Sequence, residues 1–125
     1  MTTTIGIDLG GTKVLAVRVV DGEVAAQSKF STPGGVEEIG IVAAEAAKEV
    51  WAEDVAAVGA GIAGLVRWPD GVFVWGPHVA GTHVHVREQI EAALDVPAVV
   101  DNDANTAAWG ELHLGVAQGY RDVLL

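Results

Sequence analysis

Three short apolar runs separated by two glycine turns open the chain, and this pattern constrains the fold more than any other feature of the sequence. The runs cover residues 4–9, 13–20 and 23–30. The turns are Gly10-Gly11 and Asp21-Gly22, and an Asp-Gly pair between two apolar runs is a strong signal for a β-hairpin. We therefore predict that the chain begins with three antiparallel strands.

The rest of the chain alternates between helical and extended patterns. Apolar residues at helical spacing predict a first helix with one buried stripe, formed by Val36, Ile39, Ala43, Ala46 and Val50. The later predicted elements are a buried strand at 55–62, a hairpin at 66–75 around Pro69-Asp70-Gly71, a helix at 86–94, a strand at 98–100, a helix from Asn102 with Ala107, Ala108 and Leu112 inward, and the opening of a strand at 120–125. This order predicts an α/β domain whose mixed sheet has three antiparallel strands, then parallel ones, flanked by helices.

Composition narrows the functional class. The 125 residues suffice for one domain with its own core, and half of them are hydrophobic. A net charge of −10 repels nucleic-acid phosphates and anionic lipids, so we expect neither a nucleic-acid nor a membrane partner. The chain has no cysteine, which excludes disulfides and thiolate metal sites. It shows no secretion signal and no apolar stretch of membrane-spanning length, so we expect a soluble, cytoplasmic protein.

The first motif that indicates chemistry is Asp8-Leu9-Gly10-Gly11-Thr12-Lys13, between the first two predicted strands. Gly10 and Gly11 allow the backbone to approach a phosphate group without an intervening Cβ atom. Thr12 and Lys13 add a hydroxyl group and a cation, and Asp8 can hold hydrated Mg²⁺. The alternative is an ordinary hairpin turn with a solvated aspartate. The complete string favours phosphate binding.

The second motif is Gly59-Ala60-Gly61-Ile62-Ala63-Gly64, which matches the glycine fingerprint of dinucleotide-binding proteins. That fingerprint must open a helix and precede an acidic ribose ligand by about 20 residues. A predicted hairpin follows here instead, so we reject the dinucleotide interpretation. The alternative is a purely structural role, in which the glycines only let a strand end in a tight turn.

The third motif is Asp101-Asn102-Asp103-Ala104-Asn105, at the predicted junction of a strand and a helix. Open α/β sheets bind ligands at the carboxyl ends of their strands, where this motif falls. A carboxylate at such a position can accept a proton from a hydroxyl group that attacks a phosphate. The alternative is that Asn102 or Asp103 simply caps the helix that follows.

Together these motifs resemble the ROK family of sugar kinases and regulators, whose first phosphate motif reads Asp-x-Gly-Gly-Thr-Lys and whose catalytic string reads Asn-Asp-Ala-Asn. The resemblance implies an actin-like ATPase (ribonuclease H-like) domain that phosphorylates a glucose-like hexose with ATP and Mg²⁺. It makes Asp103 the catalytic base, residues 10–13 the phosphate loop, and Asp8 the residue that holds Mg²⁺ through water. The sugar-binding residues that it implies are Gly61, Gly64, His78, Asn102 and Asp103.

Three positions depart from the family pattern, and the first is Ala63, which stands where the family usually has proline. His78 stands where family members commonly have a sugar-contacting asparagine, and Thr82 stands where they have tryptophan. Histidine still donates or accepts a hydrogen bond, but its shape and charge differ, which bears on sugar identity. His78, His83 and His85 have no carboxylate or cysteine at ligand spacing, so we expect loop histidines instead of a metal site. The cysteine-rich motif of the family zinc is absent, so we expect no zinc site.

The resemblance covers residues 1–125 as the amino-terminal lobe of such a kinase, and we expect the second lobe to be absent from this chain. Phosphoryl transfer needs two lobes that close on the substrates, so we expect the lobe alone to be weakly active. Two alternatives remain: a non-catalytic sugar-binding or assembly module, and the sugar-sensing domain of a ROK regulator. An incomplete lobe also exposes apolar surface that a second copy could cover, which favours a homodimer.

Overall fold

The computed structural model describes residues 2–31, 39–77, 82–122 and 124, and it confirms the predicted order of elements. The strands of the main sheet are β1 (Thr3–Leu9), β2 (Lys13–Val20), β3 (Glu23–Ser31), β4 (Val55–Ile62) and β8 (Ala98–Asn102). The strands of a smaller sheet are β5 (Leu65–Arg67), β6 (Val72–Trp75) and β7 (Val84–His85). The helices are α1 (Ile39–Glu49), α2 (Val86–Leu94) and α3 (Asp103–Leu114). Val36, predicted to begin the first helix, lies outside the described residues.

The main sheet is mixed, as predicted, with strand order β3-β2-β1-β4-β8. Strands β1, β2 and β3 pair antiparallel, whereas β4 and β8 continue the sheet parallel to β1. Asp21 and Gly22 both have positive φ angles, 51° and 85°, which is the conformation that a two-residue hairpin turn requires. The Asp-Gly hairpin is therefore confirmed.

The second predicted hairpin is confirmed as β5 and β6 of the smaller sheet. Gly71 closes its turn with a φ angle of 68°. The short strand β7 pairs with β6 and was not predicted, since two residues are too few to show an alternating pattern. Phe73 of β6 is fully buried in the core cluster, so the smaller sheet is packed onto the rest of the domain.

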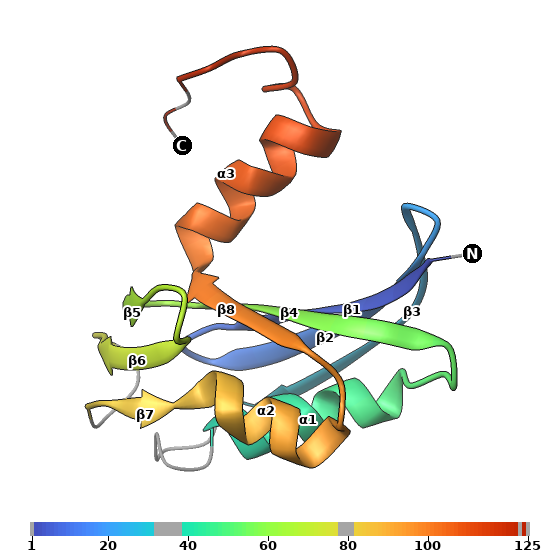
Figure 1. Ribbon diagram of the computed structural model, residues 1–125, viewed down its shortest axis with the longest axis vertical. Helices are drawn as coiled ribbons and strands as arrows, with labels where there is room; N and C mark the ends of the chain where they lie inside the picture. Colours follow the sequence, from blue (N-terminus) through green and yellow to red (C-terminus); the bar gives the residue numbers. More distant parts are fainter. Residues whose placement is uncertain (1, 32–38, 78–81, 123, 125) are drawn as a thin grey trace.

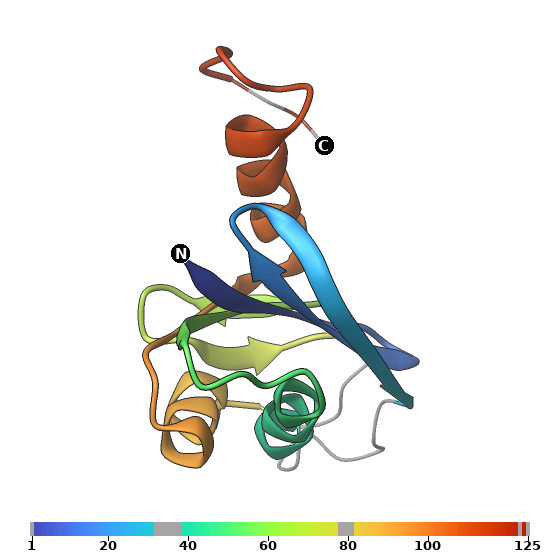
Figure 2. The ribbon, with the colours of Figure 1, turned by 90° about the vertical axis from the view of Figure 1, so that its right-hand side faces the viewer.

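Helices α1 and α2 lie together on one face of the main sheet, and α3 lies on the other side (Figures 1 and 2). Right-handed crossovers between parallel strands place α1 and α2 on the same face. Ile39, Ala43 and Ala46, three residues of the predicted stripe, are completely buried in α1. Ile90 of α2 is buried equally well. The hydrophobic core of the domain lies between these two helices and the sheet.

Helix α3 differs from the prediction. Ala107, Ala108 and Leu112 were expected to point inward, yet none of them is buried, and α3 contains no buried residue. Figure 1 shows the helix rising from the end of β8, away from the layer formed by α1 and α2. A helix buries a stripe only where another element covers it, and the described part of the chain supplies no such cover.

The predicted strand at 120–125 is wrong for the residues that the structure describes. Residues 120–122 and 124 have irregular backbone. The amide of Tyr120 donates to the carbonyl of Ala117 in a turn that follows α3, at 3.1 Å. An extended segment becomes a strand only when it pairs with a neighbour, and these residues pair with none. No helix in the described residues is long and apolar enough to cross a membrane.

Candidate functional site

Parallel pairing brings residues from all three motifs to one edge of the main sheet. Asp8 of β1 pairs with Gly61 of β4, and Gly61 pairs with Asp101 of β8. These three residues therefore form one row across three strands, and Asn102 ends the next row. Since the carboxyl ends of parallel strands meet at the same edge, the site lies where open α/β sheets bind ligands.

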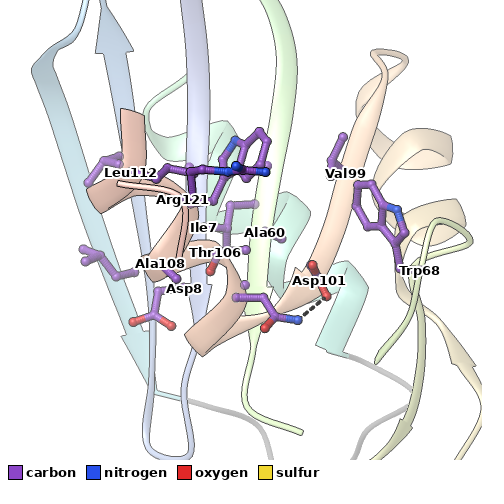
Figure 3. Close-up of a pocket in the computed structure, with 17 residues that line it drawn as sticks. Ile7, Asp8, Ala60, Trp68, Val99, Asp101, Thr106, Ala108, Leu112 and Arg121 are labelled. Carbon is purple, nitrogen blue, oxygen red and sulfur yellow. Dashed lines mark hydrogen bonds between the residues drawn. The ribbon is translucent and has the colours of Figure 1, made fainter. Parts of the chain in front are cut away.

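The row lies in a cavity of about 990 Å³ between the sheet and α3. Figure 3 shows Asp8 and Leu112 on one side of the lining and Val99 and Trp68 on the other, with Asp101 on the side of Trp68. The remaining residues of its lining are mostly apolar or small: Gly6, Ile7, Leu15, Val17, Gly59, Ala60, Gly61, Asn105, Thr106, Ala108, Trp109 and Arg121. A cavity of this size suits a small-molecule ligand or an apolar segment of polypeptide.

The predicted phosphate loop is a tight turn between β1 and β2. The amide of Gly10 donates to the carbonyl of Lys13 at 3.0 Å, and a Cβ atom on Gly10 would lie 3.1 Å from that carbonyl oxygen. Gly11, Thr12 and Lys13 are exposed. The loop therefore presents a hydroxyl group and an ammonium group to solvent next to Asp8.

Asp8 is electrostatically coupled to the third motif. Burial by its surroundings raises the pKa of the Asp8 carboxyl above its ordinary value of 3.8, and the negative charge of Asp103 raises it further. The two carboxylates are therefore close enough to repel each other. Such a pair favours a cation between or beside its members.

Gly61 permits α3 to approach the sheet. A Cβ atom at this position would lie 2.5 Å from the Thr106 hydroxyl oxygen and 3.2 Å from the Asp103 Cα atom. The Thr106 hydroxyl donates to the Asp103 carbonyl at 2.8 Å, within the same helical turn. The residue predicted to line a sugar cleft is thus also the residue that lets Asp103 lie close to β4.

Gly64 adopts a conformation that favours glycine, with a φ angle of 144°. A Cβ atom there would lie 2.5 Å from the carbonyl oxygen of Trp75 and 2.8 Å from the ring of Phe73. After this glycine the chain enters β5, and no helix opens, which confirms that the glycine string is not a dinucleotide fingerprint.

Asn102 caps α3, the alternative that the sequence left open. Its side-chain oxygen accepts hydrogen bonds from the amides of Ala104 and Asn105 at 2.9 and 3.2 Å. Its side-chain nitrogen donates to the carbonyl of Gly64 at 2.7 Å. Asp103 is the first residue of the helix, and its carboxylate accepts from the Ala104 amide at 2.9 Å.

Two of the predicted positions, His78 and Thr82, add little to the geometry of the site. His78 lies outside the described residues, and Thr82 is exposed. The described residues contain no group of three or more His, Asp or Glu side chains placed to hold a metal ion. The proposed Asp8 position for Mg²⁺ therefore depends on oxygen atoms supplied by a ligand.

Asp101, Trp68 and Trp109 had no predicted role, yet all three line the cavity. The Asp101 carboxylate accepts from the Asn102 amide at 2.7 Å and from the Asn105 side chain at 3.3 Å, the contact dashed in Figure 3. Asp101 was visible in the third motif, but its partners depend on the helix start. The tryptophans come from the turn between β5 and β6 and from α3, and no local pattern places them in one cavity.

Comparisons with known proteins agree with this geometry. The profile of the ROK family matches residues 4–125. A glucokinase of Streptomyces coelicolor is 38% identical over 127 residues, which cover 99% of this chain and 40% of the relative. An N-acetylmannosamine kinase of Escherichia fergusonii is 32% identical over 117 residues, covering 87% of this chain and 38% of the relative.

A solved structure extends the agreement to three dimensions. The crystal structure of a ROK family glucokinase from Streptomyces griseus, in complex with glucose and AMPPNP, superposes with a TM-score of 0.86 at 37% identity. The match covers 94% of this chain and 38% of that one. The domain therefore has the actin-like ATPase fold, and it spans well under half the length of the proteins that it matches.

Proposed function

The chain belongs to the ROK family, and we propose that it supplies the phosphate loop and the catalytic base for ATP-dependent phosphorylation of a glucose-like hexose. The observation that carries the proposal is the row Asp8, Gly61 and Asp101, with Asp103 beside it. This arrangement places a candidate base and a candidate phosphate loop at one edge of one sheet. The bound glucose and AMPPNP of the similar Streptomyces griseus enzyme support both substrates.

Asp103 is the proposed base. Its carboxylate takes the proton from a sugar hydroxyl while that oxygen attacks the γ-phosphorus of ATP; the bond to the bridging oxygen breaks and ADP leaves. The hydrogen bond from the Ala104 amide fixes the orientation of this carboxylate. Its position depends on Gly61, because a larger residue would displace the first turn of α3.

Residues 10–13 are proposed to hold the phosphates of ATP, and Asp8 to hold hydrated Mg²⁺. A divalent cation fits here because burial and the Asp103 charge both disfavour the ionised Asp8 in the absence of a cation. When bound, Mg²⁺ neutralises charge on the phosphate oxygens. Lys13 adds a second positive charge on the exposed loop.

Gly61, Gly64 and Asn102 are proposed to line the sugar side of the site, together with His78. At both glycines the space of a Cβ atom is taken by neighbouring protein atoms, so they shape the sugar side of the site by letting these neighbours pack closely. His78 stands in the position of the usual asparagine, and Thr82 stands in that of the usual tryptophan. These two differences are proposed to determine which sugar this chain prefers. N-acetylmannosamine kinase among the relatives widens the range of hexoses to test.

Calorimetric titration of the 125-residue chain tests the proposal. Asp103→Asn is expected to weaken glucose binding by about tenfold or more, because a hydrogen bond to a charged group contributes ~1.5–3 kcal/mol. Lys13→Ala is expected to weaken binding of Mg²⁺-AMPPNP. The matched controls are Asp95→Asn, at the end of α2, and Lys48→Ala, at the end of α1, which make the same charge changes on the covered side.

Three outcomes would contradict the proposal: no binding of either ligand, equal losses in the controls, or unchanged affinity in Asp103→Asn and Lys13→Ala. Catalysis by this chain alone is expected to be slow, since closure of a second lobe excludes water from phosphoryl transfer. A coupled assay of ADP release measures this, and brisk turnover by the 125-residue chain would refute the need for a second lobe.

Helix α3 supports an assembly role as the second candidate. Trp109, Leu114 and Val116 are largely exposed on it and just after it. Exposed apolar residues gathered on one element are typical of a surface that another polypeptide covers. Analytical ultracentrifugation distinguishes the proposed homodimer from a monomer, and a concentration-independent monomer would remove the homodimer proposal.

A further inference from the structure

One side chain connects the second motif with the third. Asn102 uses its side-chain oxygen to accept from the first-turn amides of α3 and its side-chain nitrogen to donate to the Gly64 carbonyl. Residues 64 and 102 are 38 positions apart in the sequence. The first-turn contacts are an ordinary helix cap. The contact with Gly64 is not needed for capping, so it requires another explanation.

The Gly64 end of this connection is fixed by packing. The positive φ angle of Gly64 and its close approach to Trp75 and Phe73 leave the turn little room to move. Gly76 also packs against this turn, because a Cβ atom there would lie 2.5 Å from the Ala63 carbonyl oxygen. Phe73 itself is fully buried. The Gly64 carbonyl therefore offers a rigid acceptor in the turn between β4 and β5.

The α3 end of the connection has few other supports. The helix buries no side chain, so its attachment to the domain is concentrated in its first turn. That turn contacts β4 where Gly61 leaves space, and Asp101 accepts from Asn105. Asp103 is the first helical residue and follows Asn102 directly. Any movement of the Asn102 side chain is thus transmitted to the proposed base.

We infer that Asn102 is a positioning residue: its hydrogen bond to the Gly64 carbonyl fixes the start of α3, and with it Asp103, against the glycine turn on the sugar side of the site. The catalytic part of this inference, the positioning of Asp103 as the base, rests on the proposed function. The hydrogen bond between Asn102 and Gly64 is already present in the ligand-free protein. A pure cap would fix the helix but leave its placement relative to Gly64 open.

Two substitutions separate these roles. Asn102→Asp keeps an acceptor oxygen at the same distance from the first-turn amides but has no proton to donate to Gly64. Asn102→Ser also keeps a capping oxygen and is too short to reach Gly64. The variants differ in charge and size, and they share the loss of the Gly64 contact. Asn105→Ala is the matched control, because it removes a side-chain amide from the same turn without touching Gly64.

Amide hydrogen exchange of the ligand-free chain, measured by NMR, is the decisive test. Both variants are expected to speed exchange at the amides of residues 104 and 105, in the weakly supported first turn of α3, by about tenfold, the effect of one lost hydrogen bond, while residues 63–65, which packing holds in place, change little. The control keeps the contact with Gly64 and should change exchange in this turn by much less. Exchange at residues 104 and 105 within twofold of wild type in both variants would overturn the inference, as would an equal change in the control. If one variant does not fold, the other decides.

A glucose titration of the same samples shows whether the connection serves the site. In the wild type, resonances of Gly64 and Asp103 are expected to shift together with one dissociation constant. In Asn102→Asp the shift at Asp103 should shrink severalfold relative to that at Gly64. Equal shifts in both proteins would refute the positioning role. A wild-type chain that binds no glucose contradicts the proposed function and the catalytic meaning, while the exchange experiment still decides whether the connection exists.

Discussion

The two faces of the main sheet differ in what covers them: two packed helices cover one face, and a cavity lies on the other. On one face, α1 and α2 bury aliphatic side chains that include Ile39 and Ile90, both with no exposed surface. On the other face, the sheet and α3 enclose a cavity that contains Asp8 and Asp101. Fully burying one large aliphatic side chain stabilises a fold by ~1.5–3 kcal/mol. Packing on the covered face therefore stabilises the domain, so the open face can carry charged side chains.

This difference also explains why glycines gather on the open face. Gly59 of β4 is exposed, with no atom within 4 Å of a Cβ position, and Gly61 provides the space that Thr106 of α3 fills, whereas Val58 and Ile62 of the same strand are buried. Alternation along one strand thus provides packing on one side and room for a ligand or a helix on the other. The same strand contributes to stability and to the site through opposite faces.

The largest expected effect is on the covered face. Ile90→Ala is predicted to destabilise the domain by ~2–5 kcal/mol, because it removes buried methyl groups and leaves a cavity. Leu114→Ala, at the end of α3, is predicted to cost less than ~1 kcal/mol, because that side chain stays 79% exposed and little of it leaves water on folding. Urea denaturation of both variants measures the difference. Equal losses would show that α3 is as firmly packed as α2.

Gly61→Ala is predicted to have the next largest effect. The new methyl group would meet Thr106 and Asp103, and overpacking of this kind costs ~1–3 kcal/mol. Gly59→Ala is the matched control on the same strand, since a Cβ atom there has no neighbour within 4 Å. Thermal stability should fall in the first variant and stay close to the wild-type value in the second. Similar behaviour of the two variants would refute the close approach of α3 at Gly61.

The smallest predicted effect is the pH dependence contributed by Asp8. Its raised pKa means that the folded state holds this proton more tightly than the unfolded state does. The stability that it contributes is therefore present below the ordinary value of 3.8 and is lost as pH rises through the folded-state pKa. Asp8→Asn should remove this loss and make the domain slightly more stable at neutral pH, in contrast to the substitutions above.

Asp103→Asn provides the matching electrostatic measurement. Removing the neighbouring charge should lower the pKa of Asp8 part of the way, with burial accounting for the remaining shift. NMR titration of the Asp8 side-chain carboxyl carbon measures it directly, with Asp95→Asn as the control. An unchanged Asp8 pKa in the Asp103 variant would mean that the two carboxylates are farther apart than the structure has them.

The sequence predicted the elements that depend on local chemistry. The Asp21-Gly22 hairpin, the buried stripe of α1 and the order of elements along the chain all follow from turn residues and hydrophobic spacing. The sequence also predicted that three motifs form the site, because each lies at the end of a predicted strand, and this stays a prediction. Long-range pairing could not be read in this way. The contact between Asn102 and Gly64 depends on how β8, β4 and the smaller sheet meet.

Helix α3 shows most clearly what hydrophobic spacing cannot predict. Its apolar residues predicted an inward face, but spacing shows only which residues a helix can bury and not whether another element covers them. Ala107 of α3 is exposed, whereas Ala43 of α1, which also belongs to a predicted apolar stripe, is buried. The stripe on α1 faces a sheet that the same chain provides, whereas Ala108 and Leu112 of α3 line the cavity.

We propose that the three motifs form one ligand site at the carboxyl edge of the main sheet. A map of amide chemical-shift changes in the 125-residue chain, on addition of glucose and then Mg²⁺-AMPPNP, tests this proposal. We expect changes at Gly61, Gly64, Asn102 and Asp103 with glucose, and at residues 10–13 with the nucleotide. Residues of α1 and α2 that face the core should not shift. Changes centred on those helices, or none at any of the three motifs at saturating ligand, would show that the motifs do not form one site.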